Sequence, residues 1–240
     1  MAKLLEAEGL VKAFGGMIAV NKVDFHINEG EILGLIGPNG AGKTTLFNLI
    51  SGYLRPDAGL VNFGGKRISG LRPYHICHAG IARTFQASKN FPDMSVRENA
   101  LIGAIFGKPG TSRERAEAET DEILAFVGLA EYADRAVTDI PLAGRKHLEV
   151  ARALATKPIV LMLDELMAGL NPTEVGEAME LVKRIRASGV TVLMIEHVMK
   201  AIMNICDRVI ALHHGSLIAE GAPQEIARDA QVIEVYLGGV

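Results

Sequence analysis

The sequence predicts an α/β fold with a mostly parallel sheet, and three observations indicate it. Short apolar runs that suit buried strands, such as residues 32–36 and 159–163, recur along the chain. Between them lie segments such as 173–187, whose apolar residues have helical spacing. A glycine-rich loop opens a helix directly after residues 32–36. Alternation of buried strands with helices is typical of parallel sheets with crossover helices.

The first strands lie close together in the chain. Strand-like segments occur at residues 4–10, 23–27, 32–36 and 60–63. Glycine pairs and Glu29-Gly30 separate them, as turn residues separate short strands.

The middle of the chain differs in character. Residues 90–157 read mostly as helices, and the charged run 113–119 is interpreted as a solvated helix face. Strand signals return at 159–163, 190–195 and 208–212, and two short helices are expected in the tail. The expected organisation is a single domain: a core at 1–88 and 158–220, a helical subdomain at 89–157, and C-terminal short helices at 221–240.

Composition excludes several classes of protein. The chain has 240 residues, a net charge of −3 and 49% hydrophobic residues, so disorder and a basic nucleic-acid surface are not expected. Cys77 and Cys206 lack metal-ligand spacing, which favours thiols in a reducing cytosol. The N-terminus does not resemble a signal peptide, and no apolar run suits a membrane span. We therefore expect a soluble, cytoplasmic protein that reaches a membrane only through a partner.

A complete phosphate-binding P-loop, G-x-x-x-x-G-K-[ST], follows the strand at 32–36. Its backbone N–H groups and the following helix N-terminus suit phosphate oxygens. Lys43 is expected to reach the β- and γ-phosphates, and the Thr44 hydroxyl to ligate Mg²⁺. The alternative is an ordinary glycine-rich turn, which the strand and helix on either side disfavour. The expected nucleotide-binding residues are Gly37, Pro38, Asn39, Gly40, Ala41, Gly42, Lys43, Thr44 and Thr45.

Two acids, Asp164 and Glu165, end the buried run at 159–163. Alone, such acids are often strand caps. With a P-loop in the same chain, they predict that Asp164 holds the Mg²⁺ shell and that Glu165 is the general base for an attacking water.

Two further polar residues follow predicted strands. His197 comes after the run 190–195, where a γ-phosphate contact competes with a role as a cap or core residue. Gln86 ends the segment 81–85, where its amide is expected to contact Mg²⁺ or the attacking water, although an isolated Gln is usually a surface residue. We expect three strand ends at one sheet edge to bring Lys43, the two acids and His197 around one triphosphate.

In the order of these motifs, the chain resembles the ATP-binding subunits of ABC transporters over essentially its whole length. Residues 37–45, Gln86, Asp164-Glu165, residues 168–171 and His197 fall on that family's Walker A, Q-loop, Walker B, D-loop and H-loop positions. The resemblance implies a RecA-like P-loop NTPase fold with an antiparallel β edge and an inserted helical subdomain. It also implies that Phe14 stacks on adenine, with Val20 beneath the ring.

The family's signature segment, Leu-Ser-Gly-Gly-Gln, is altered here. Counting back from Ala151 places Pro141 at the serine position, which removes a hydroxyl and an N–H. The resemblance implies that Leu142, Ala143 and Gly144 still face ATP held by an opposite subunit, with Arg145 or Lys146 as compensating cations. In a heterodimer, we expect the site completed by this segment to turn over more slowly.

Several stretches narrow the resemblance to importers of branched-chain amino acids, although urea-import and lipopolysaccharide-export ATPases share much of the pattern. They are residues 82–86, 91–99, 168–174, 195–197 and 218–226. The implied partners are a second ATPase subunit in a homo- or heterodimer, multi-spanning permease subunits and, indirectly, a solute-binding protein. The implied location is the cytoplasmic face of the inner membrane. Phe85, Phe91, Met94 and Val96 suit either a groove for a permease helix or subdomain core.

Three other classes compete. A kinase or GTPase is disfavoured because no Asn-Lys-x-Asp segment is present. A soluble ABC ATPase of repair or translation usually carries coiled coils or duplicated cassettes, which this chain lacks. A catalytically dead scaffold is disfavoured because Lys43, Asp164, Glu165 and His197 are all in place.

Overall fold

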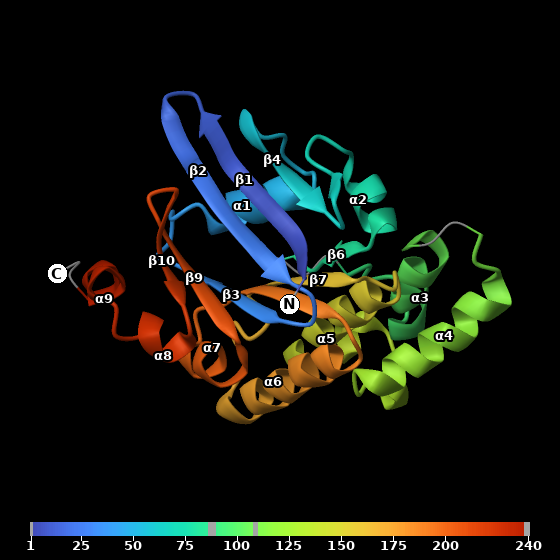
Figure 1. Cartoon of the computed structure of the whole chain (residues 1–240). Helices are drawn as coiled ribbons and strands as arrows, with labels where there is room; N and C mark the ends of the chain where they lie inside the picture. Colours follow the sequence, from blue (N-terminus) through green and yellow to red (C-terminus); the bar gives the residue numbers. More distant parts are fainter. Residues whose placement is uncertain (1, 86–89, 108–109, 238–240) are drawn as a thin grey trace. The chain divides into compact units, whose positions relative to one another are not determined.

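The computed structural model describes residues 2–85, 90–107 and 110–237 (Figure 1). The chain forms two compact units: a first unit of Met1–Ile76 and Thr191–Val240, and a second unit of Cys77–Val190. These bounds are not those of the expected core and helical subdomain, and that division stays a prediction.

The first unit begins with an antiparallel sheet of order β2-β1-β4-β5. Its strands are β1 (Lys3–Phe14), β2 (Met17–Asn28), β4 (Ala58–Phe63) and β5 (Lys66–Arg67). β1 and β2 extend well beyond the predicted 4–10 and 23–27 and meet in a hairpin (Figure 1). Register shifts between Ala7 and Leu10 and beyond interrupt the alternation of apolar and polar residues, so periodicity alone underestimated both strands.

The parallel strands of the first unit are centred on β3 (Ile32–Ile36). β3 pairs in parallel with β8 (Thr191–Ile195) on one side and β9 (Arg208–His213) on the other. All residues of β3 and β8 are buried, as expected of parallel strands covered on both faces. β10 (Ser216–Gly221) pairs antiparallel with β9.

Helices of the first unit include α1 (Lys43–Ile50), α7 (Met199–Ile205), α8 (Pro223–Ile226) and α9 (Ala230–Leu237). α2 (Pro73–Ala79) lies where the chain passes from the first unit to the second. The tail thus has the two short helices that the sequence predicts. A buried apolar cluster joins α7, α8 and α9 to β3 and β9; its members are Ile36, Ile202, Val209, Ala211, Ile226 and Val232.

The second unit combines two parallel strands, β6 (Ile81–Arg83) and β7 (Val160–Asp164), with several helices. The helices are α3 (Val96–Gly107), α4 (Arg113–Phe126), α5 (Leu142–Leu154) and α6 (Pro172–Ala187), with 3₁₀ turns at Ala130–Tyr132 and Val137–Asp139. A Cβ on Gly103 would lie 2.2 Å from the Arg152 carbonyl oxygen, so this glycine allows α3 and α5 to pack closely.

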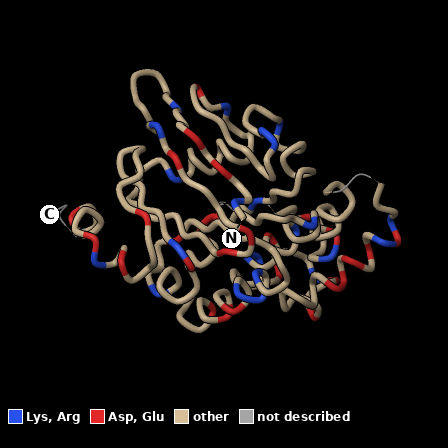
Figure 2. The backbone as a smooth tube through the Cα atoms, in the orientation of Figure 1, with Lys and Arg blue, Asp and Glu red and all other residues tan. Residues whose placement is uncertain are grey.

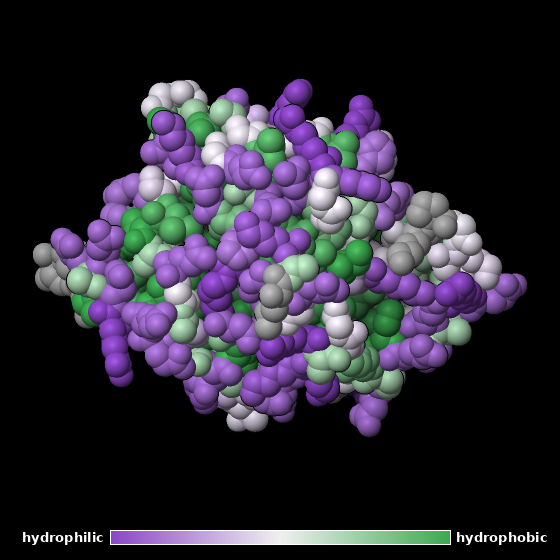
Figure 3. Space-filling view, viewed as in Figure 1, coloured by the Kyte–Doolittle hydropathy of each residue, from purple (hydrophilic) through white to green (hydrophobic). Residues whose placement is uncertain are grey.

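Figure 3 shows hydrophilic side chains over most of the face in view, with smaller hydrophobic areas between them. Charges of both signs intersperse along α4 (Figure 2), where Arg113–Glu117 and Arg115–Glu119 form i,i+4 ion pairs. The charged run is therefore a solvated helix face, as expected. Throughout the described ranges, every helix is too short or too polar to cross a membrane.

Candidate nucleotide-binding site

Glycine is required at both ends of the P-loop. Gly37 has φ 151°, and a Cβ there would lie 2.3 Å from the Leu212 carbonyl oxygen. Gly42 has φ 104°, and its Cβ would lie 2.3 Å from the Ala19 carbonyl oxygen on β2. Positive φ and close backbone contact together exclude side chains at these two positions. The loop therefore fits tightly between β9 and β2.

The helix that follows the loop begins with N–H groups that have no acceptor within the helix. The first bond of α1 runs from the Leu46 N–H to the Gly42 carbonyl oxygen at 2.9 Å. The N–H groups of Lys43, Thr44 and Thr45 therefore have no intrahelical acceptor. Thr44 is exposed, so its hydroxyl is accessible. Donors and helix dipole together form an anion site.

The Lys43 side chain lies along the loop. Its Nζ donates to the carbonyl oxygens of Gly37 at 2.7 Å and Pro38 at 3.0 Å, and the residue is only 6% exposed. The ammonium group therefore lies against the backbone of the first two residues of the loop. Asn39 and Gly40, at the tip of the loop, are exposed, whereas Ala41 is buried.

The two residues expected to contact adenine lie on the β1–β2 hairpin. Phe14 ends β1 and is 45% exposed, with the Lys12 ammonium 5.7 Å from its ring centroid. Val20 is fully buried and belongs to the apolar core. Phe14 is thus available for stacking, while a direct contact of Val20 with the base stays a prediction.

His197 lies near the carboxyl end of β8, the neighbour of β3. Leu35 of β3 is opposite Ile195 of β8, so the P-loop and the Glu196-His197 segment leave the same edge of the sheet. His197 is exposed, whereas Glu196 is buried. The sequence analysis expected three strand ends at one sheet edge, and two of them, the ends of β3 and β8, lie side by side in the first unit. That the acids face the same triphosphate stays a prediction.

Asp164 ends β7 in the second unit and is 2% exposed. Arg83 of β6 donates from Nη2 to its Oδ2 at 2.8 Å, and the Asp164 N–H donates to the Thr84 hydroxyl at 3.1 Å. Burial raises the pKa of the Asp164 carboxyl, and the Arg83 guanidinium opposes that rise. Sequence reasoning assigned no role to Arg83 or Thr84. The sequence feature that could have identified Arg83 is a cation at the end of a short apolar strand.

Glu165 has a strained backbone. Its φ of 52° lies in the left-handed region, which a non-glycine residue occupies at a cost of about 1–2 kcal/mol. Its carbonyl oxygen accepts a hydrogen bond from Lys146 Nζ at 2.9 Å. Strain of this kind concentrates at functional sites, where the surroundings hold it in place. Lys22, Lys157 and His214 share this backbone conformation, so the catalytic role of Glu165 stays a prediction.

The altered signature segment opens helix α5. Pro141 is the N-cap and supplies no side-chain cap, and the first helical bond runs from the Arg145 N–H to the Pro141 carbonyl oxygen at 3.0 Å. The N–H groups of Leu142, Ala143 and Gly144 therefore have no intrahelical acceptor. Of the two expected compensating cations, Lys146 bonds the Glu165 carbonyl. Arg145 Nε is buried and unbonded as far as the described residues show.

Gln86, which was expected to contact Mg²⁺ or the attacking water, lies outside the described residues.

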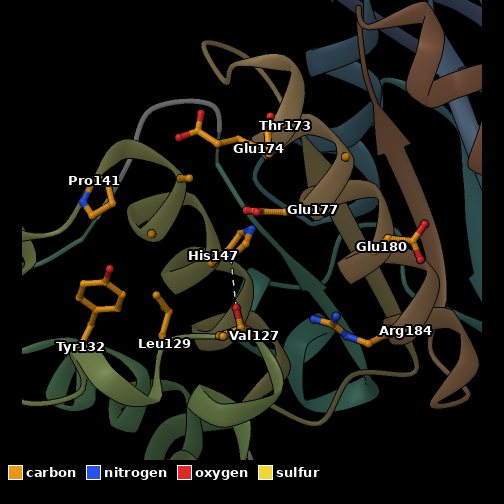
Figure 4. A pocket seen from close by; sticks show the side chains of 14 residues that line it. Val127, Leu129, Tyr132, Pro141, His147, Thr173, Glu174, Glu177, Glu180 and Arg184 are labelled. Atoms are coloured by element: carbon orange, nitrogen blue, oxygen red, sulfur yellow. Dashed lines mark hydrogen bonds between the residues drawn. The ribbon is translucent and has the colours of Figure 1, made fainter.

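A cavity of about 670 Å³ adjoins this segment (Figure 4). Pro141, Ala143 and Gly144 line one side, and α6 lines the other. Figure 4 shows His147 between Val127 and Glu177, and its Nδ1 lies 3.1 Å from the Val127 carbonyl oxygen. Burial lowers the pKa of His147.

The residues present fit ATP and Mg²⁺. The uncapped N–H groups of α1 and the adjacent ammonium group of Lys43 suit phosphate. The exposed Thr44 hydroxyl is a hard oxygen donor of the kind that Mg²⁺ prefers. That the Asp164 carboxylate of the second unit shares the same Mg²⁺ ion stays a prediction.

Two family models match the chain. The ABC transporter model matches residues 20–168. A second model, described as branched-chain amino acid ATP-binding cassette transporter, matches residues 216–240.

Relatives and solved structures agree with these matches. The high-affinity branched-chain amino acid transport ATP-binding proteins BraF of Pseudomonas aeruginosa and LivG of Escherichia coli are each 38% identical, over 98% of both chains. A nucleotide-free ATP-binding cassette from an ABC transporter superposes with a TM-score of 0.90 at 33% identity. The alignment covers 99% of this chain and 100% of that one. An ADP conformation of an ABC cassette gives a TM-score of 0.90 at 34% identity, with the same coverage. The chain belongs to the ABC transporter family and has the ATPase cassette fold of that family.

Proposed function

We propose that this chain is the ATP-hydrolysing subunit of an importer of branched-chain amino acids. The assignment of branched-chain amino acids as the cargo depends on the similarity to BraF and LivG over 98% of both chains, together with the C-terminal match at residues 216–240. The P-loop geometry supports nucleotide binding. Import of urea or amides, export of lipopolysaccharide and a non-transport role of a soluble ATPase are the alternatives.

The residue roles follow the family pattern. Residues 37–45 hold the triphosphate, with Lys43 at the β- and γ-phosphates, and Phe14 stacks on adenine. Thr44, Gln86 and Asp164 hold Mg²⁺, which when bound would neutralise charge on the phosphates. Glu165 takes the proton of the attacking water, and His197 donates a hydrogen bond to the γ-phosphate.

The partners are proposed on the same basis. Two ATPase subunits close on two ATP molecules, and Leu142, Ala143 and Gly144 of one subunit contact ATP held by the other. Multi-spanning permease subunits bind the pair at the cytoplasmic face of the membrane, and a solute-binding protein delivers the cargo. Exposed Phe91 and Phe106 of the second unit are candidate contacts for a permease helix, whereas Val96 is fully buried and belongs to the core.

Purification of the tagged chain from detergent-solubilised membranes of its source tests the proposal, with uptake of labelled leucine, isoleucine and valine measured in cells that lack the chain. We expect multi-spanning proteins to co-purify. We also expect wild-type chain to restore uptake, whereas Lys43→Ala restores none because the phosphates lose their cation.

The outcome also separates the alternatives. Recovery of urea uptake alone would assign a different cargo. Co-purification without any multi-spanning protein would refute the transporter assignment altogether.

A further inference from the structure

The C-terminal helix contacts the P-loop directly. The Gly37 N–H donates a hydrogen bond to the Tyr236 hydroxyl oxygen of α9 at 2.7 Å. Gly37 is the first residue of the loop and is buried, so its N–H needs a partner within the protein. α9 lies in residues 216–240, the segment that the branched-chain amino acid family model matches, and the proposed function gives this helix no role.

Helix α9 is attached at two points that share one face. Val232 is 6% exposed and belongs to the apolar cluster that contains Ile36, the residue before Gly37. Tyr236 follows Val232 by four residues, which places both side chains on the same side of the helix. Asp229 accepts a hydrogen bond from the Val232 N–H at 3.0 Å and so fixes the start of α9. The hydroxyl is therefore held in place by a seated helix.

The Tyr236 bond has a counterpart on the other side of Gly37. The Gly37 carbonyl oxygen accepts from Lys43 Nζ at 2.7 Å, while the N–H bonds Tyr236. The two bonds fix the peptide groups before and after a residue with φ 151°, where a glycine otherwise has wide conformational freedom. Loss of the Tyr236 bond would let Gly37 relax and shift the carbonyl oxygen that accepts from the Lys43 ammonium group.

We propose that Tyr236 is a positioning residue for the P-loop, through which the C-terminal helix sets the geometry of nucleotide binding. The inference rests on the proposed role of Lys43 at the phosphates. Tyr236 itself contacts the loop backbone and takes no part in the chemistry. The family-specific tail is thereby assigned a role in holding the nucleotide site in its binding conformation before ATP arrives.

Tyr236→Phe tests the proposal, because it removes the hydroxyl and keeps the ring. We expect Mg-ATP to bind the full chain about 2–10-fold more weakly by calorimetry, the range expected for loss of one hydrogen bond. In the assembled transporter, the KM for ATP should rise by the same factor while kcat at saturating ATP stays within about two-fold. The Gly37 amide should exchange its hydrogen faster in the variant.

Ile233→Ala is the matched control, because Ile233 is on the same helix and 40% exposed. It should leave both affinity and Gly37 exchange unchanged. Unchanged affinity and unchanged Gly37 exchange in Tyr236→Phe would overturn the positioning role. Lys43→Ala tests the proposed function separately: wild-type affinity in that variant would refute the phosphate role of the P-loop lysine, whatever Tyr236→Phe shows.

Discussion

At the end of β7, two consecutive acids are held in different ways. Asp164 is buried against the Arg83 guanidinium, and its backbone is tied to Thr84. Glu165 instead has a left-handed backbone. The arrangement gives one acid a fixed, paired carboxylate and turns the chain sharply at the next. Such a division suits a metal ligand followed by a general base.

Replacement of Glu165 by Gln tests the second role. Gln keeps the size of the side chain and removes the basic oxygen, so the ATPase rate should fall by about 100-fold or more. ATP affinity should be retained, because the P-loop is unchanged. Phosphate release and nucleotide binding, measured on the same preparation, check the two expectations. A variant that hydrolyses ATP at the wild-type rate would exclude Glu165 as the base.

Replacement of Arg83 by Met tests the pairing of Asp164. The change leaves a buried carboxylate without its cation, which should lower the free energy of unfolding by about 3–5 kcal/mol. Urea denaturation of the nucleotide-free chain measures the effect. The double variant Arg83→Met with Asp164→Asn should recover much of the loss, since no uncompensated charge remains. Equal destabilisation in both variants would show that Arg83 acts through packing instead.

On the scale of elements, α5 carries both the signature segment and a buried histidine. His147 faces Val127, and the charges that act on it are Glu177, Glu174 and Arg184 of α6. Burial holds its pKa below the ordinary value of 6.5, because the cationic form is poorly solvated. Protonation of His147 is therefore linked to the packing of α5 in the second unit.

This linkage predicts a pH dependence. Above pH 6.5, His147 is neutral in both folded and unfolded chains, and stability is unaffected. As the pH falls below 6.5, the unfolded chain gains a proton before the folded one does, so stability is lost at up to about 1.4 kcal/mol per pH unit. His147→Gln should remove this loss while keeping a donor for Val127. Urea titrations between pH 7.5 and pH 5 check it; parallel profiles for variant and wild type would contradict it.

The elements that the sequence predicted best are those with uninterrupted apolar character. The buried strands β3, β7 and β8 and the helix α6 lie within two residues of the predicted segments. The prediction did worse at β1 and β2, where register shifts break the alternation. β10 was missed because all of its residues except one are partly buried, so no face of the strand stands out.

The candidate site was predictable where chemistry follows local sequence. The P-loop conformation depends on glycines and on a helix start that adjacent residues determine. The Arg83–Asp164 pair joins residues 81 positions apart, and the Tyr236–Gly37 bond joins residues 199 apart. Such partners depend on strand order and helix docking, which no local pattern specifies.

In the molecule as a whole, the residues of the proposed chemistry are divided between the two compact units of the structure. The P-loop and His197 belong to the first unit, and the two acids and the signature segment to the second. In the proposed dimer, each ATP also needs the signature segment of the opposite subunit. A change in that segment therefore affects a partner's ATP more than the chain's own.

The altered signature segment has a proline, which carries no hydroxyl group, at the N-cap of α5. A serine hydroxyl bonded to a charged phosphate oxygen contributes about 1.5–3 kcal/mol, and Pro141 cannot supply it. Restoring the family residues with Pro141→Ser and Ala143→Gly should therefore raise the ATPase rate of the reconstituted pair. A serine N-cap should also stabilise α5 by about 1 kcal/mol, so unfolding must be measured beside turnover.

Pro141→Ala with Ala143→Gly is the matched control, because it removes the proline without adding a hydroxyl. A rate increase confined to the serine variant would assign the effect to the phosphate contact. Arg145→Gln tests whether Arg145 takes the place of the missing serine, since Arg145 Nε is the buried donor that the described residues leave unbonded. If Arg145 replaces the serine, Arg145→Gln should lower turnover and the serine variant should rescue it. No change, or a fall, in the serine variant would show that the proline-containing segment already completes the site.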